Sequence, residues 1–346
     1  AQMDTILLPH DYLNFYLTGE RCMEAGDASG TGFLNITTRT WSEKMLAAID
    51  PDRDLTTCLP EAKLTNESIG ELLPSVAREV GLPPGVPVSI GGGDNMMGAL
   101  GTGNVTAGVV TMSLGTSGTV YACSDKPIID EKGNIAAFCS STGNWLPLLC
   151  TMNCTVTTEL MRNLLKADMA SFEAQLNISS RGAEGVITLP YFNGERTPNL
   201  PDAKGCILGL DARNMRSENI LRSAVDGATF ALRFGLDELS QLGISADQIV
   251  LTGGGANSAT WRQVVADICN APVTVLKNNE GAGFGAALQA LAMLENRNND
   301  LSKLTSDHLQ SDSALSREPS SSAVNFYSDI YETYQRGAQK VAELYG

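Results

Sequence analysis

The stretch 248–276, QIVLTGGGANSATWRQVVADICNAPVTVL, decides the fold class. It begins with a β-prone run, Gln248–Thr252, which ends in three glycines. A helical pattern follows over 260–270, and a second β-prone run covers 273–276. Another set of glycines then precedes a helix that reaches about residue 294. This alternation of strand, glycine turn and helix predicts an α/β architecture.

The turn Gly253-Gly254-Gly255-Ala256-Asn257 is a candidate ligand site because it follows a strand. Ligands of α/β sheets bind at the carboxyl ends of the strands. A plain strand-to-helix turn explains these residues about equally well when the turn is considered alone.

Upstream, the sequence predicts a hairpin of strands 109–114 and 119–122, joined by Gly115-Thr116-Ser117-Gly118. Backbone N–H groups and two hydroxyls at such a tight turn can bind an anion, phosphate above all. An ordinary glycine-rich hairpin is the alternative, and it is favoured when the turn is taken alone.

Further elements follow from apolar periodicity and from breakers. Helices are expected over 156–165, 172–176, 217–242 and about 324–344. Residues 298–322, rich in Ser, Asp and Asn, are predicted to form a mobile surface excursion.

The first 82 residues are predicted to be mostly helical, with almost no strands. Helices are expected over 42–49 and within 69–80, the latter broken or kinked at Pro74. Because an α/β domain needs several more strands than this region offers, we expect a strand-rich N-terminal portion to be absent.

The overall composition narrows the class of function. A net charge of −15 argues against nucleic acid and anionic membranes as partners. No apolar run approaches the about 20 residues that cross a bilayer. The eight cysteines are scattered, without a CxxC pair, which favours a reducing, cytoplasmic location and argues against a zinc or redox motif. His10 and His308 are the only histidines, so a general base is expected to be a carboxylate.

Asp94 is the candidate for that base. It follows the β-prone run 88–90 and the glycines 91–93, which let the chain bend sharply and let a ligand come close. The alternative is that Asp94 caps a helix over 95–100.

Two nucleotide-binding patterns can be set aside. Gly281-Ala282-Gly283-Phe284-Gly285-Ala286 fits the dinucleotide fingerprint, but no strand follows its helix, so NAD binding is discounted. These glycines are expected to allow close approach of a helix to the nucleotide or to the sheet instead. The sequence also contains no P-loop. The two remaining turns and Asp94 together suggest a nucleotide cleft between two lobes.

Four ordered motifs resemble those of the FGGY carbohydrate kinases. The run 205–210 with 219–226 resembles the C-terminal signature of the family, and 91–95 its catalytic-base motif. Residues 113–118 are similar to its second phosphate loop, and 251–258 to its adenosine motif.

The resemblance implies an α/β, two-lobed, actin-like or ribonuclease H-like ATPase fold with an incomplete first domain. Residues 1–104 would be the C-terminal part of the first, sugar-binding domain, and 105–346 the second, nucleotide-binding domain. It also implies a cytoplasmic enzyme, a possible homodimer, with sugar, ATP and Mg²⁺ as its small-molecule partners and with no nucleic acid or membrane partner. No residue of this chain is assigned as a metal ligand.

By the same resemblance Asp94 would be the catalytic base, and Asp94 and Asn95 would contact the sugar. The residues implied for ATP are Gly115, Thr116, Ser117, Gly118, Gly253, Gly254 and Asn257. The implied reaction is phosphorylation of a ketopentose, D-xylulose to D-xylulose 5-phosphate. Another sugar or polyol kinase of the family (ribulose, gluconate, fucose or glycerol) and a non-catalytic, actin-like nucleotide-binding module are the alternatives.

Overall fold

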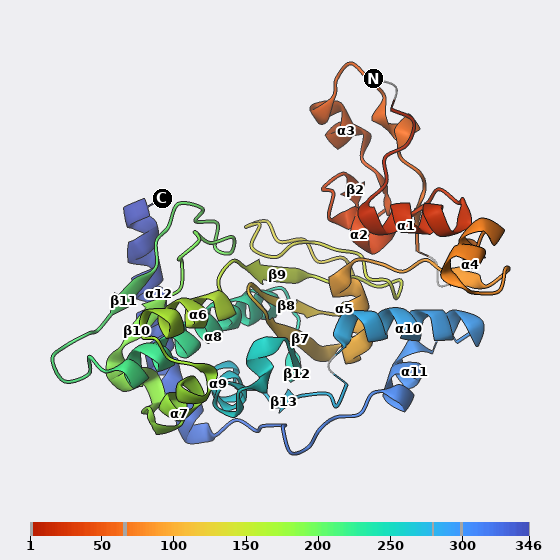
Figure 1. The fold of residues 1–346 in the computed structure, drawn as a ribbon. Helices are drawn as coiled ribbons and strands as arrows, with labels where there is room; N and C mark the ends of the chain where they lie inside the picture. Colours follow the sequence, from red (N-terminus) through yellow and green to blue (C-terminus); the bar gives the residue numbers. More distant parts are fainter. Residues whose placement is uncertain (1–2, 65–67, 279, 298–299, 346) are drawn as a thin grey trace.

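The computed structural model describes residues 3–64, 68–278, 280–297 and 300–345. A small N-terminal lobe projects from a larger body that is built around one sheet (Figure 1). The helix that begins at Asp94, α5 (Asp94–Thr102), lies where the chain passes from the lobe into the body.

The sheet of the body is mixed and has the strand order β13-β12-β7-β8-β9. Strands β7, β8 and β9 form an antiparallel meander. Strand β12 pairs in parallel with β7, and β13 pairs in parallel with β12. The strands are β7 (Gly108–Leu114), β8 (Gly118–Ala122), β9 (Leu148–Thr151), β12 (Ala246–Thr252) and β13 (Val273–Thr274). The predicted hairpin and the parallel pair are therefore both present.

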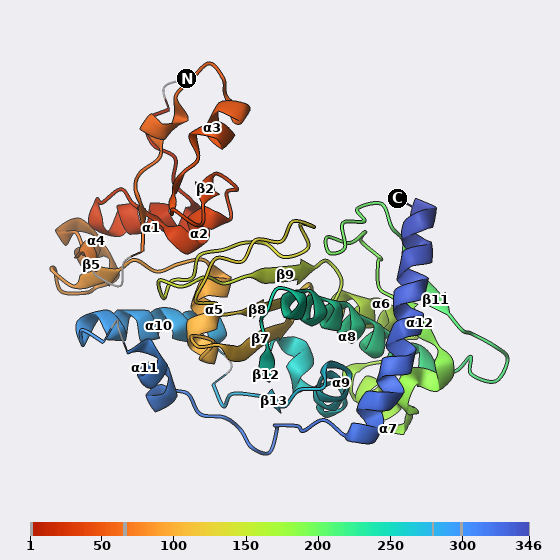
Figure 2. The ribbon, with the colours of Figure 1, turned by 180° about the vertical axis from the view of Figure 1, so that it is seen from behind.

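Both faces of this sheet are covered by other elements. Successive strand residues point to opposite faces, so neighbouring residues belong to different clusters. Val120 belongs to the main core, which the long helix α8 fills, whereas Tyr121 belongs to a second cluster with Met97 and Leu100 of α5. The body helices are α6 (Thr155–Leu164), α7 (Met169–Ile178), α8 (Ser217–Gln241), α9 (Ala259–Cys269), α10 (Gly281–Leu294), α11 (Leu301–His308) and α12 (Ser321–Tyr345). Seen from behind, α12 runs along the outer side of α8 and α9 (Figure 2). The described residues also contain three short 3₁₀ segments, η1 (Leu55–Cys58) in the lobe and η2 (Arg181–Gly185) and η3 (Gly254–Asn257) in the body. The body has in addition a small antiparallel pair, β10 (Ile187–Leu189) and β11 (Cys206–Leu208).

The N-terminal lobe contains more strand than the sequence predicts. Its helices are α1 (Pro9–Thr18), α2 (Ala25–Ser29), α3 (Glu43–Ile49) and α4 (Pro74–Val80). Its short strands are β1 (Met23–Glu24), β2 (Leu34–Asn35), β3 (Thr40–Trp41), β4 (Ala62–Lys63), β5 (Ser68–Glu71) and β6 (Pro87–Ser89). The helix predicted within 69–80 begins only at Pro74, because proline suits a first helical turn but not a helix interior. The residues before it pair as β5 with β6.

The prediction of a mobile excursion over 298–322 is wrong for the residues that the structure describes there, which exclude 298 and 299. Leu301 and Leu304 lie on one face of α11 and are buried against the second cluster. Leu276 and Val273 form bridges with Ser311 and Arg317. The two buried leucines and these bridges together hold the segment against the body.

Gly285 of α10 and Gly101 of α5 let the two helices cross at very short range. A Cβ on Gly101 of α5 would overlap the carbonyl oxygen of Gly281, and one on Gly285 would overlap that of Met97. These positions must therefore stay without a side chain. The close approach of the helix is therefore present, but its partner is the helix α5 and not, as expected from the sequence, the nucleotide or the sheet.

Candidate active site

The two predicted nucleotide turns lie side by side at one edge of the sheet. Strands β7 and β12 are parallel neighbours, with Ser113 opposite Thr252. Their carboxyl ends therefore meet at the same edge, and the turns 115–117 and 253–257 follow them directly. Gly253 has a φ of 85°, and a Cβ there would be only 2.7 Å from the backbone of Leu114. Only glycine allows this contact between the two turns.

The hairpin turn is held by the first turn of α6. The backbone N–H of Thr155 donates to the carbonyl of Gly115 at 2.9 Å, and that of Cys154 donates to the carbonyl of Thr116 at 3.0 Å. The side chains of Thr116 and Ser117 are exposed. The turn is thus fixed through its carbonyl groups, while its hydroxyls face solvent.

A cavity of about 560 Å³ opens beside the turn after β12, and none of the hairpin residues Gly115–Gly118 is among those that line it. This size is ordinary for a small-molecule site. Its walls come from α6, α7 and the turn after β12, and they are lined by Thr155, Thr158, Glu159, Met169, Phe172, Glu173, Gly254, Gly255, Asn257, Ser258, Ala259 and Trp261. Gly254 and Asn257 are residues that the sequence already points to. The α6 and α7 residues are new, because their helices were predicted but nothing in the sequence marked them as cavity walls.

Contacts between helices fix the shape of the cavity. Ser258 Oγ donates to Glu173 Oε2 at 3.1 Å, and Thr260 Oγ1 donates to Asn177 Oδ1 at 2.8 Å. Arg262, which is buried, donates through Nη1 to the carbonyls of Ala256 and Asn257. The turn after β12 is therefore held in place from both α7 and α9.

Asp94 is the first residue of α5 and is exposed. Gly93, not Asp94, occupies the N-cap position, so the capping alternative does not describe this helix. The backbone N–H and the side-chain amide of Asn95 both donate to Asp94 Oδ1, at 2.8 and 3.0 Å. A carboxylate that is exposed and oriented by its neighbour can accept a proton from a bound hydroxyl group.

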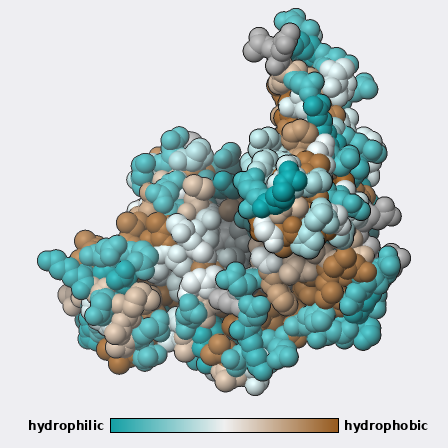
Figure 3. Space-filling model, turned by 45° about the vertical axis from the view of Figure 1, so that its right-hand side comes forward, coloured by the Kyte–Doolittle hydropathy of each residue, from teal (hydrophilic) through white to brown (hydrophobic). Residues whose placement is uncertain are grey.

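The glycines before Asp94, hereafter the base loop (Gly91–Gly93), are closely surrounded at Gly92 and Gly93, and Gly91 has a φ of 72°. A Cβ on Gly92 would meet Ser141 Oγ at 2.7 Å, and one on Gly93 would meet Asp27 Oδ1 at 3.2 Å. Glu24, which is buried, accepts hydrogen bonds from Ser141 Oγ and from the Asp27 N–H. The base loop is thus packed against polar groups of the N-terminal lobe and of the segment between β8 and β9. The space-filling view shows the surface hollowed between that lobe and the body (Figure 3).

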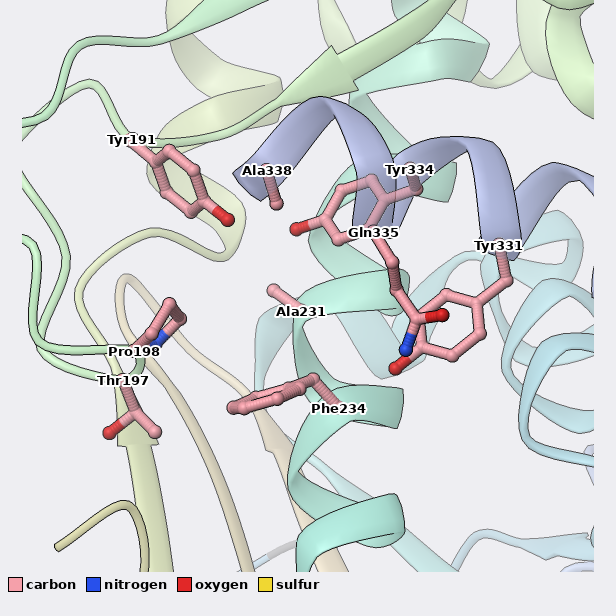
Figure 4. Close-up of a pocket in the computed structure, with 9 residues that line it drawn as sticks. All are labelled: Tyr191, Thr197, Pro198, Ala231, Phe234, Tyr331, Tyr334, Gln335 and Ala338. Carbon is pink, nitrogen blue, oxygen red and sulfur yellow. The ribbon is translucent and has the colours of Figure 1, made fainter. Parts of the chain in front are cut away.

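A second cavity, of about 200 Å³, lies in the body between α8, α12 and the segment 191–198 (Figure 4). It is lined mainly by aromatic side chains, including Tyr191, Phe234 and Tyr334. None of the predicted site residues lines it, so it is not part of the candidate active site.

Comparison with known proteins places the chain in a family. The C-terminal domain of the FGGY family of carbohydrate kinases matches residues 110–294, and the N-terminal domain of that family matches residues 1–101. The chain belongs to the FGGY family of carbohydrate kinases. In the ranges that the structure describes, no helix combines the length and the apolar composition needed to cross a membrane.

Curated relatives carry the name xylulose kinase. The one from Haemophilus influenzae is 43% identical over 334 residues, which cover 96% of this chain and 67% of the relative. The one from Escherichia coli is 34% identical over 99% of this chain and 70% of its own length. The one from Streptomyces rubiginosus is 38% identical over 84% of this chain and 57% of its own length. The chain thus spans between 57% and 70% of the length of these relatives.

Solved structures confirm the predicted fold class. A xylulose kinase from Bifidobacterium adolescentis is 29% identical with a TM-score of 0.80, covering 94% of this chain and 68% of its own. A ligand-bound xylulose kinase from Lactobacillus acidophilus has a TM-score of 0.91 at 24% identity, covering 99% of this chain and 69% of its own. The mixed sheet of the body accords with the two-lobed, actin-like arrangement.

Proposed function

We propose that this chain belongs to an ATP-dependent xylulose kinase that converts D-xylulose into D-xylulose 5-phosphate. The observation that carries the ATP part is the cavity beside the turn after β12, at the sheet edge where the hairpin turn also lies. The sugar is proposed from the curated relatives, which are named xylulose kinases at up to 43% identity.

In this proposal ATP lies across the carboxyl edge of the sheet. Its adenosine would occupy the cavity against Gly254 and Asn257, next to Gly253, with Phe172 and Met169 as apolar walls. Its phosphates would meet the hairpin turn Gly115–Gly118, where Thr116 and Ser117 offer exposed hydroxyls. Mg²⁺ as the counter-ion of ATP is part of the proposal, since it neutralises phosphate charge in kinases generally. We assign it no ligand from this chain.

Asp94 would act on the sugar. Its carboxylate accepts the proton of a sugar hydroxyl, and the oxygen of that hydroxyl forms a bond to the γ-phosphorus of ATP. The bond between this phosphorus and the bridging oxygen breaks, and ADP leaves with the bonding electrons. Asn95 orients the carboxylate through its two hydrogen bonds to Oδ1 and contacts the sugar. Positioning and charge stabilisation supply most of the catalysis in such transfers. A homodimer and a cytoplasmic location stay predictions of the sequence.

The test is an assay of ADP release with xylulose, ribulose, gluconate, fucose and glycerol as acceptors. We expect release to depend on xylulose above the others. Asp94→Asn should lower kcat by about 10²–10⁴-fold, the usual contribution of a positioned base, and leave ATP binding unchanged. The exposed Asp52→Asn serves as the matched control.

Two outcomes would contradict the proposal. Full turnover of the Asp94→Asn variant would remove Asp94 as the base. Tight ATP binding without ADP release in the presence of any sugar would favour the non-catalytic nucleotide-binding module.

A further inference from the structure

His10, in the first turn of α1, contacts hydrogen-bond acceptors through both ring nitrogens. Its Nδ1 lies 2.9 Å from Asp27 Oδ2, and its Nε2 lies 3.2 Å from the carbonyl oxygen of Ile90. The same Nε2 lies 3.3 Å from Asp11 Oδ1. A carbonyl can only accept, so Nε2 must carry a hydrogen, and a carboxylate at Nδ1 is best met by a second one. The ring therefore fits its surroundings as an imidazolium.

The partners of His10 flank the base loop on both sides. Ile90 is the residue directly before Gly91, and its carbonyl also accepts from Asn14 Nδ2 at 2.7 Å. Asp27 lies beside Gly93, the last residue before Asp94. One side chain thus contacts the residue directly before the loop, and its partner Asp27 lies beside the end of the loop.

The charges around His10 favour its protonated form. Three carboxylates face it, those of Asp11, Glu24 and Asp27. Burial lowers the pKa of His10, but the hydrogen bond to Asp27 and these charges outweigh burial, so the pKa is raised overall. Asp11 is fully buried, and its Oδ2 has no hydrogen-bond partner among the described residues, so this carboxylate depends on His10 for compensation.

The same side chains could be considered as a metal site, because ligand atoms of His10, Asp11 and Asp27 lie within 4.8 Å of one another. A metal needs a lone pair on the imidazole. Here Nε2 faces a carbonyl that can only accept, and Nδ1 faces a carboxylate. The geometry therefore points to the imidazolium itself as the cation of this cluster.

We propose that His10 is a positioning residue that holds the base loop, and through it Asp94, in its reactive arrangement only while both ring nitrogens are protonated. The effect on turnover rests on the proposed function of Asp94. The charge state of His10 and its contacts beside the base loop do not depend on that function.

The first test is NMR of the imidazole ¹⁵N nuclei, which is simple because the chain has only two histidines. We expect one ring to be doubly protonated at pH 7.5, to disappear in His10→Gln and to persist in His308→Gln, whose target is exposed on α11. Asp27→Asn should lower its titration midpoint. The amide signals of Gly91–Gly93 should shift with the same midpoint. A neutral His10 ring at pH 7 would overturn the proposal, and so would amide signals of Gly91–Gly93 that do not shift when His10 titrates. Both outcomes are independent of whether the chain turns over sugar.

The second test compares His10→Gln with the charge-conserving His10→Lys. His10→Gln should lower kcat on the order of 10-fold through a misplaced base, with the KM for ATP unchanged. His10→Lys should recover part of this loss, and it should lack the alkaline fall in kcat that the wild type shows at the NMR midpoint. Equal kcat in all three proteins, with only the melting temperature lowered, would show a merely structural role.

Discussion

Gln289 exchanges two hydrogen bonds with the backbone of Gly91, 198 residues earlier in the chain. The Gly91 N–H donates to Gln289 Oε1 at 2.8 Å, and Gln289 Nε2 donates to the Gly91 carbonyl at 3.0 Å. Gln289 is 1% exposed. A helix of the body therefore holds the first residue of the base loop.

Replacing Gln289 by alanine should leave both backbone groups of Gly91 unpaired in a part-buried site. A buried polar group without a partner costs about 1–3 kcal/mol, so the free energy of unfolding should fall by that order. Turnover should fall as well, because the loop before Asp94 loses its support. Chemical denaturation and kcat measure the two effects. Gln310→Ala, at an exposed position, is the control, and equal behaviour of the two variants would refute the prediction.

Gly285→Ala should prevent the native crossing of α5 and α10, because the new methyl group would overlap the Met97 carbonyl. The expected loss in unfolding free energy is at least about 1–3 kcal/mol, as for overpacked cores. Gly283→Ala is the matched control, since its Cβ would meet only the end of the Glu280 side chain at 3.8 Å. That variant should be unchanged or slightly more stable, because alanine favours helix. Thermal unfolding of the two variants and the wild type measures these differences in stability.

The stability of the N-terminal lobe should fall as the pH rises from about 4.5 to about 7, because burial raises the pKa of Glu24 from 4.5 to about 7. A raised pKa means that the folded lobe binds a proton more tightly than the unfolded chain, so this stabilisation is complete below 4.5 and is lost through 7. The difference corresponds to roughly 3 kcal/mol. Asp11, with a pKa raised by burial to about 6, acts in the same direction.

Urea unfolding at pH 5 and pH 8 measures this dependence. Glu24→Gln should flatten it over this range, while Glu43→Gln on the exposed side of α3 should leave it intact. A lobe that becomes more stable towards pH 8 would show that these carboxylates are better compensated than their burial suggests.

Asn257→Ala should weaken ATP binding without unfolding the protein, since Asn257 is exposed and lines the cavity. The loss of one hydrogen bond at a ligand site corresponds to about 1 kcal/mol, or roughly a five-fold increase in the dissociation constant. Calorimetric titration with ATP gives this constant. Asn163→Ala, exposed on the neighbouring α6, should bind ATP as the wild type does, and a matching loss there would contradict the assignment of the cavity.

Local signals explain which elements the sequence could predict. The turn after β12 and the β7–β8 hairpin follow from glycines next to β-prone runs, and the structure contains both. The partners of the base loop could not be predicted in this way. Gln289 is an ordinary helix residue in the sequence, and its contact with Gly91 exists only through the crossing of α5 and α10. The prediction for 298–322 is wrong for the opposite reason. The polar residues around Leu301 and Leu304 dominate the local pattern, although these two side chains are buried.

The segment before Asp94 is hydrogen-bonded from two sides of the molecule, at Gly91 by Gln289 of the body and at the Ile90 carbonyl by His10 and Asn14 of the lobe. The helix that follows is packed on the body by the glycine crossing, while its Met96 side chain lies against Gly26 of the lobe. The lobe is also tied to the body away from this segment, since the Cys139 N–H donates to Ser29 Oγ and Trp145 Nε1 donates to the Ile36 carbonyl. Because the crossing fixes α5 to the body, Asp94, its first residue, would keep its distance to the nucleotide edge of the sheet. The proton acceptor and the phosphate donor would then share one rigid frame.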